Sequence, residues 1–98
     1  MTRQITLRVN ENPINLDYFV EGFVDHTVSG IIAALKGTGE IVYLDVAIDR
    51  ENVSVILNGA DVPVNLFASK IIRNTLTGLV SSLKGVDVAE KIAIAIQR

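Results

Sequence analysis

Apolar and polar residues alternate along residues 4–10, which is the first regular pattern in the chain. Ile5, Leu7 and Val9 occupy every second position, with polar residues between them. Successive side chains of a β-strand point to opposite faces of its sheet, so this alternation predicts a strand with one buried face. The polar stretch 11–13, which ends in proline, predicts a turn after it.

From Leu16 onward the apolar residues recur at spacings of three and four, which is typical of a helix with a wide apolar stripe. Asp17 is a residue type that caps the start of a helix, and Gly37 is a type that follows its end. We therefore expect a helix of about 19 residues between them. The expected stripe consists of Leu16, Phe19, Val20, Phe23, Val24, Thr27, Val28, Ile31, Ile32 and Leu35.

Residues 41–48 alternate again, and the polar connection 49–52 predicts a hairpin to a third strand at 53–57. A second helix, with Asn65 as its N-cap and Gly85 after its end, and a last strand at about 88–97 complete the chain. In the second strand we expect one set of side chains to face the core: Val42, Leu44, Val46 and Ile48. The other set is expected on the opposite face: Ile41, Tyr43, Asp45 and Ala47.

The same pattern occurs twice, at an offset of 48 residues. Residues 1–50 and 49–98 align without a gap, and ten of the fifty aligned pairs are identical. The identical pairs include Asn10 with Asn58, Phe19 with Phe67 and Gly30 with Gly78. We interpret this as an internal duplication, with pseudo-twofold halves 1–50 and 51–98 within one domain, 1–98.

The order β-α-β-β-α-β predicts an α+β fold in which two βαβ units form a two-layer sandwich. Right-handed crossovers place both helices on one face of the sheet. The simplest arrangement is ferredoxin-like, with the first and third strands central and the second and fourth at the edges. Other strand orders are compatible with the same elements and stay open.

Composition narrows the function classes. The chain is 49% hydrophobic, its mean hydropathy is +0.40, and its net charge is −2. The high apolar fraction and low charge suggest that part of the surface meets another chain. No basic stripe is present, which argues against nucleic acid or an anionic membrane as a partner. The absence of cysteine excludes disulfides and thiol chemistry. With no signal-peptide core and no long apolar run, we expect a cytoplasmic protein.

His26 is the only histidine, and it lies near Glu21 and Asp25 on the first predicted helix. These three are candidate site residues, because histidine and carboxylates serve as metal ligands or general bases. A solvated helix face is the favoured interpretation, so no catalytic residue, metal or cofactor is predicted. Gly30 and Gly78 fall within helices, where glycine is unfavourable by about 1 kcal/mol. We expect them to mark a close approach between the helices or to a partner.

The sheet face away from the helices is the predicted interface. RNA-binding sheets of this class carry aromatic residues on their central strands, and those positions here hold Thr6, Arg8, Ser54 and Ile56. The fourth strand is apolar, carries few charges and, as an edge, would be poorly protected against pairing with another chain. The candidate interface residues are Tyr43, Ile56, Lys91, Ala93 and Ala95.

These observations favour a non-enzymatic, homo-oligomeric module that serves protein interaction or the sensing of a small ligand. The expected partner is a second copy of the chain, as a homodimer or a larger assembly, with another protein or a small ligand as further options. The alternative is a small enzyme whose site forms at an oligomer interface and uses His26, Asp25 and Glu21.

Overall fold

The computed structural model describes residues 4–36, 41–83 and 89–97, and shows a mixed α+β protein. The glycines at 37 and 85 that were predicted to follow the helices lie outside these residues. The elements are β1 (Gln4–Val9), β2 (Asn12–Ile14), α1 (Tyr18–Lys36), β3 (Tyr43–Asp49), β4 (Asn52–Leu57), β5 (Ala60–Asp61), α2 (Leu66–Ser81) and β6 (Lys91–Gln97).

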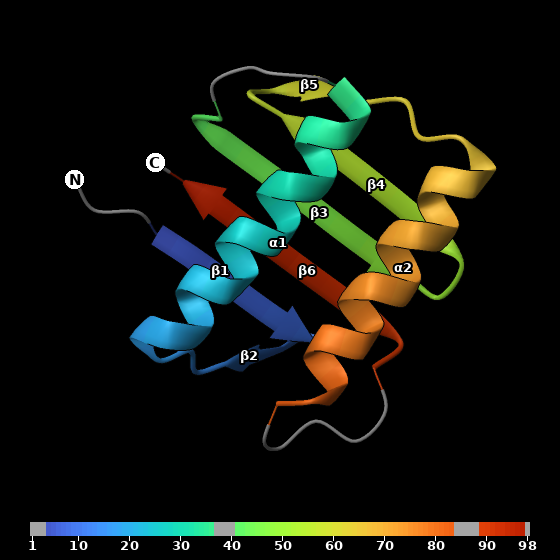
Figure 1. Ribbon diagram of the computed structural model, residues 1–98. Coiled ribbons are helices and arrows are strands. Elements are labelled where there is room, and N and C mark those ends of the chain that lie inside the picture. Colours follow the sequence, from blue (N-terminus) through green and yellow to red (C-terminus); the bar gives the residue numbers. More distant parts are fainter. Residues whose placement is uncertain (1–3, 37–40, 84–88, 98) are drawn as a thin grey trace.

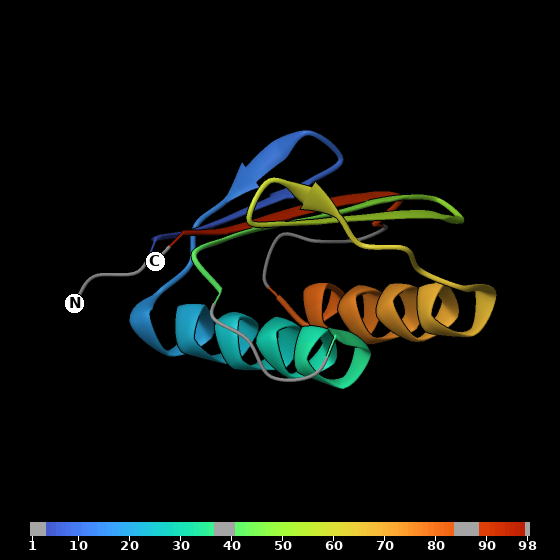
Figure 2. The same ribbon diagram turned by 90° about the horizontal axis from the view of Figure 1, so that it is seen from above.

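The elements form two layers. The six strands make one antiparallel sheet in the order β2-β1-β6-β3-β4-β5. Both helices cover the same face of this sheet, as predicted, and they lie side by side with opposite directions (Figures 1 and 2). Short hairpins add β2 to β1 and β5 to β4, and these two short strands lift away from the sheet on the side opposite to the helices (Figure 2).

The predicted ferredoxin-like strand order is wrong. The second and fourth long strands, β3 and β6, are central, and the first and third, β1 and β4, flank them. The inner faces explain this order, because every inward residue of β6 and β3 is at most 3% exposed, whereas Ile5 and Val53 in the flanking strands are only partly buried. In addition, β2 pairs with β1 and β5 pairs with β4. Each of these two long strands therefore has one side that is not paired with another long strand.

The strand register relates the two halves at the same offset of 48 that the sequence shows. Val46 lies directly opposite Ile94, its own counterpart, in the pairing of β3 with β6. The pair Val9 and Ile92, in β1 and β6, corresponds to the pair Leu57 and Leu44, in β4 and β3. A pseudo-twofold axis therefore passes between Val46 and Ile94, perpendicular to the sheet.

Asn10 and Asn58 fasten the hairpin corners in the same way in both halves. Each has a positive φ of 51°, and asparagine is among the few residues that adopt this region readily. The Oδ1 atom of Asn10 accepts the backbone N–H groups of Glu90 and Lys91, both at 3.0 Å. The Oδ1 atom of Asn58 accepts those of Val42 and Tyr43, both at 2.9 Å. Each asparagine thus holds the start of a central strand.

The Asn58 contact also corrects the predicted alternation of the second strand. Val42 is exposed, whereas Ile41 is buried in the core, the reverse of the expectation. Two consecutive N–H groups, those of Val42 and Tyr43, point at one oxygen, which a regular strand does not allow. The alternation therefore begins at Tyr43, where β3 starts, and not at Ile41.

Both predicted N-caps are confirmed. Asp17 Oδ1 accepts the N–H of Val20 at 2.8 Å, and Asn65 Oδ1 accepts the N–H of Ala68 at 2.7 Å. On each helix the buried stripe is narrower than predicted, because only about one residue per turn is buried. In α1 the fully buried apolar residues are Val24, Val28 and Ile32, and in α2 they are Ala68, Ile72, Leu76 and Val80.

Candidate interaction surface on the helix layer

None of the five aromatic side chains of the protein lies in its core. Phe19 is 74% exposed, Phe67 is 72% exposed, and Phe23 is 51% exposed. Phe19 and Phe23 belong to the apolar stripe predicted for the first helix, and Phe67 is the counterpart of Phe19 in the second, yet all three are exposed. Single exposed apolar residues are normal on soluble proteins, whereas large groups of them are uncommon on monomers and mark contact surfaces.

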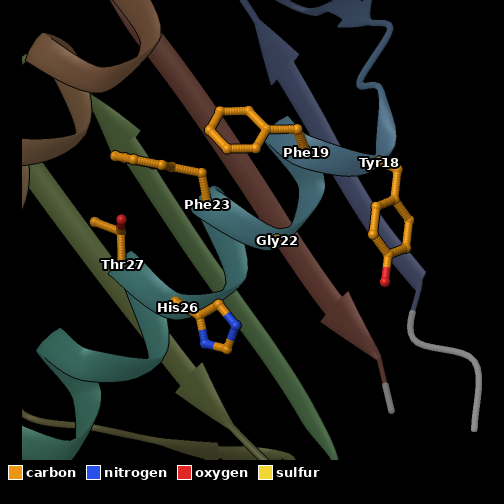
Figure 3. A pocket seen from close by; sticks show the side chains of 6 residues that line it. All are labelled: Tyr18, Phe19, Gly22, Phe23, His26 and Thr27. Carbon is orange, nitrogen blue, oxygen red and sulfur yellow. The ribbon is translucent and has the colours of Figure 1, made fainter.

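On α1 the exposed aromatic side chains form a cluster. The rings of Phe19 and Phe23 contact each other, with centroids 6.2 Å apart and planes inclined at 48°. Figure 3 shows that Phe19, Phe23 and Thr27 project from one side of the helix, toward α2, whereas Tyr18 and His26 project from the opposite side. The cluster therefore faces the space above the sheet between the two helices.

The second helix presents counterparts of the same residues. Leu66, Phe67 and Ile71 of α2 correspond at the offset of 48 to Tyr18, Phe19 and Phe23 of α1, and all six are exposed. We call these six residues the helix-layer patch. Because the pseudo-twofold axis relates the two helices, the patch presents a similar apolar surface on both of them.

The two mid-helix glycines do not mark a contact within the chain. A Cβ atom placed on Gly30 or on Gly78 meets no atom of the described residues within 4 Å, and both glycines are exposed. The expectation that they let the two helices approach each other is therefore wrong. Both positions are exposed, with open space beside the backbone.

A hollow of about 620 Å³ runs along the outer side of α1 (Figure 3). Its lining residues are Tyr18, Phe19, Gly22, Phe23, His26 and Thr27, and all six come from this one helix. Small-molecule sites are concave and bury most of their ligand, which a single helix surface does not do. The hollow is therefore part of the helix-layer patch and not an enclosed ligand site.

The candidate residues His26, Asp25 and Glu21 do not form one site. His26 is exposed and Glu21 is partly buried, whereas Asp25 is only 2% exposed and accepts a hydrogen bond from Ser29 Oγ at 3.0 Å. The predicted solvated acidic face is thus wrong for Asp25, because consecutive helix positions point in directions about 100° apart. Within residues 4–36, 41–83 and 89–97, no group of three or more histidine and acidic side chains is placed to hold a metal ion.

The open face of the sheet carries small and polar side chains. Ala93 is exposed, Ala95 and Ile56 are partly buried, and Lys91 lies 3.5 Å from Glu11 in an exposed ion pair. Tyr43 Oη donates a hydrogen bond to Asp45 Oδ2 at 3.0 Å. This hydrogen bond and the negative charge of Asp45 raise the pKa of the Tyr43 phenol above its ordinary value.

The predicted edge pairing through the fourth strand is wrong, because β6 is bonded on both sides, to β1 and to β3. Burial of this strand within the sheet accounts for its apolar sequence without any partner. The outer strands of the described sheet are β2 and β5.

Comparison of the chain with models of protein families, with curated proteins and with solved structures finds no match. None of the helices in the described part of the chain is both long and apolar enough to cross a membrane.

The helix-layer patch is the candidate interaction surface that the sequence alone did not reveal. The periodicity assigned the phenylalanines to the core, since exposed and buried phenylalanine look the same in a sequence. One signal was available, because the stripes were wider than the face that a sheet can cover. The pairs Tyr18-Phe19 and Leu66-Phe67 also place a large apolar residue on neighbouring positions, and adjacent helix positions do not share one face.

Proposed function

We propose that this protein is a non-catalytic, self-associating interaction module, and that a second copy covers the helix-layer patch. One observation carries the proposal: large apolar side chains are exposed at equivalent positions near the start of both helices. Burying a phenylalanine or leucine side chain contributes about 1.5–3 kcal/mol each. The six residues of the patch would therefore supply a strong driving force for association.

The size of the helix layer suits a stable dimer. The molecule measures 35 × 33 × 18 Å, and the helices cover one of its two broad faces (Figures 1 and 2). A specific interface buries about 800 Å² on each partner. A face with these dimensions exceeds that area, so two copies can meet on it without using the edges of the sheet.

A second copy suits this surface better than other partners do. A homodimer contact is isologous and uses the same surface on both subunits, so a second copy meets this apolar patch with an equally apolar one. The net charge of −2 and the absence of a basic stripe give no electrostatic attraction to nucleic acid or to anionic lipid. The open hollow on α1 offers no enclosed site, so protein interaction is preferred over small-ligand sensing.

We also propose that the two halves arose by duplication of a βαβ unit. Three features support this origin: the ten identical pairs, the strand register at the same offset, and the equivalent hydrogen bonds of Asn10 and Asn58. Such an origin explains why the apolar patch is present on both helices.

The test is sedimentation of the wild type and of a Phe19→Ser, Phe67→Ser double variant at micromolar concentration. We expect a dimer for the wild type and, because two large apolar groups are lost from each copy, a Kd raised about a hundredfold or more in the variant. The melting temperature of the dilute variant should match that of the dilute wild type, because neither side chain contributes to the core.

Ala93→Lys provides the matched control on the open sheet face. A lysine there should leave the dimer intact if the helix layer is the interface. If Ala93→Lys disrupts the assembly and the serine variant does not, the sheet face is the interface. A wild type that sediments as a monomer contradicts self-association altogether.

A further inference from the structure

A second hollow, of about 580 Å³, lies between the middle of α2 and the sheet. Its lining comes from three separate segments: the end of β3 with the turn that follows it, the middle of α2, and the residues just before β6. In Figure 1 this region lies beside α2, next to the β3–β4 turn and the start of β6. Because several segments line it, this hollow can contact a ligand from more than one side, which the hollow on α1 cannot.

The room for this hollow comes from a small residue at a position that is filled in the other half of the chain. Ala89 and Ile41 are counterparts at the offset of 48, and each directly precedes the two N–H groups that an asparagine binds. Ile41 is buried in the core, whereas Ala89 is partly buried and lines the hollow. The smaller alanine side chain leaves unfilled the space that isoleucine occupies at the equivalent place.

The polar side chains that α2 contributes also differ from their counterparts. In α1, Asp25 is 2% exposed and accepts a hydrogen bond from Ser29. The counterparts in α2, Arg73 and Thr77, are partly buried and line the hollow, four positions apart and so on one side of the helix. Within the described part of the chain, Arg73 has no hydrogen-bond or ion-pair partner. Such a guanidinium favours a ligand with a carboxylate, whose two oxygens match its fork of N–H groups.

The charges around the hollow are balanced, which narrows the class of ligand further. Arg50 and Glu90 offset each other, because Arg50 Nη2 lies 3.7 Å from Glu90 Oε2. Glu51 is the other acidic side chain on the lining; it is exposed, and no residue in the described ranges pairs with it. A multiply charged anion such as phosphate would be repelled by both carboxylates, whereas a carboxylate joined to an ammonium group matches Arg73 and Glu51.

We infer that this hollow binds a small zwitterion, namely a free α-amino acid. Arg73 receives the carboxylate, the Thr77 hydroxyl donates a further hydrogen bond to it, and Glu51 accepts the ammonium group. The site adds a ligand to the proposed self-association and does not depend on it, since no residue of the helix-layer patch lines the hollow.

NMR titration of the isotope-labelled protein tests the site, with the common α-amino acids added one at a time. Sodium acetate, methylammonium chloride and inorganic phosphate are the comparison ligands. We expect at least one amino acid to shift the backbone amide signals of residues 50–51, 73–78 and 89–90, and to bind several-fold more tightly than any comparison ligand. If no amino acid shifts these signals, the inference is wrong. If acetate or phosphate binds as tightly as the best amino acid, the zwitterion is wrong.

Arg73→Gln and Lys70→Gln form a matched pair, since each removes one positive charge from α2 and only Arg73 lines the hollow. Loss of a charged hydrogen bond should raise the Kd of the amino acid about tenfold or more in Arg73→Gln. Lys70→Gln should leave this Kd unchanged. An equal loss in both variants would mean that the charge of the helix, and not the hollow, attracts the ligand.

Ala89→Ile tests the hollow without changing any charge, because it inserts the side chain that the counterpart position carries. We expect the variant to lose amino-acid binding while its circular dichroism and melting temperature stay those of a folded protein. An unchanged Kd in this folded variant overturns the location of the site. Sedimentation of the same variant reports self-association separately, so a monomeric wild type removes the proposed dimer and leaves this inference to the titration.

Discussion

Single side chains determine where the central strands of this sheet begin. Asn58 combines a left-handed backbone with an amide oxygen that accepts two N–H groups, and Asn10 repeats this arrangement. The sequence showed that the two asparagines are equivalent, but it predicted only a turn at each. Their role depends on backbone groups that lie 15 and 16 residues away for Asn58 and 80 and 81 residues away for Asn10, a separation that local patterns do not convey.

Asn58→Ala is expected to destabilise the protein by about 1–3 kcal/mol, because it leaves two strand N–H groups without this acceptor and places alanine at a positive φ. Chemical denaturation measures the change. Asn58→Gly separates the two causes, since glycine tolerates the backbone but lacks the oxygen. Asn74→Ala, at an exposed helix position, serves as the control, and an equal loss there would contradict the explanation.

Tyr43 is expected to ionise at a higher pH than an ordinary tyrosine, whose pKa is about 10. The hydrogen bond to Asp45 stabilises the protonated phenol, so the folded protein holds its proton where the unfolded chain has lost it. Stability from this group is therefore present below the unfolded pKa and is lost as the pH rises through the folded one. Ultraviolet titration of a Tyr18→Phe variant isolates Tyr43, and adding Asp45→Asn should lower its pKa toward the ordinary value.

At the scale of elements, the sequence predicted the four long strands, both helices and both N-caps, because each has a local pattern. Strand order was not predictable in the same way. Two orders satisfy the same crossovers, and the choice depends on how completely each inner face is buried. The predicted alternation failed at Ile41 and Val42 for a similar reason. The hydrogen bonds to Asn58, which is distant in the sequence, shift the start of the alternation by two residues.

Gly30→Ala and Gly78→Ala are each expected to stabilise the isolated chain by about 0.5–1 kcal/mol, since alanine is the better helix former and its methyl group meets no atom of the described residues outside the neighbouring helix backbone within 4 Å. Thermal unfolding at a concentration below the dimer Kd measures this gain. If either substitution destabilises the dilute chain, the helix must pack more closely at that glycine than the structure shows.

At the scale of the whole molecule, the two helices that cover one broad face carry six large exposed apolar residues. The wild type should therefore melt at a temperature that rises with protein concentration, because dimer formation stabilises the folded state by mass action. Calorimetry over a hundredfold range of concentration measures the rise. The Phe19→Ser, Phe67→Ser variant should melt at one temperature throughout, and a similar slope in both proteins would contradict the role of the patch.

The short strands β2 and β5 have a consequence for how far association can proceed. The outermost backbone of the sheet is only three residues long on one side, including Pro13, which has no N–H to donate, and two residues long on the other. The strand β2 covers Leu7 to Val9 of β1, and β5 covers Ile56 and Leu57 of β4, and short border strands of this kind are one way in which natural sheets discourage pairing with another chain. Growth by strand addition is thus hindered along the covered part of each border, and the proposed contact through a broad face would close on itself after two copies. The same hairpins that frame the sheet make the expected assembly finite.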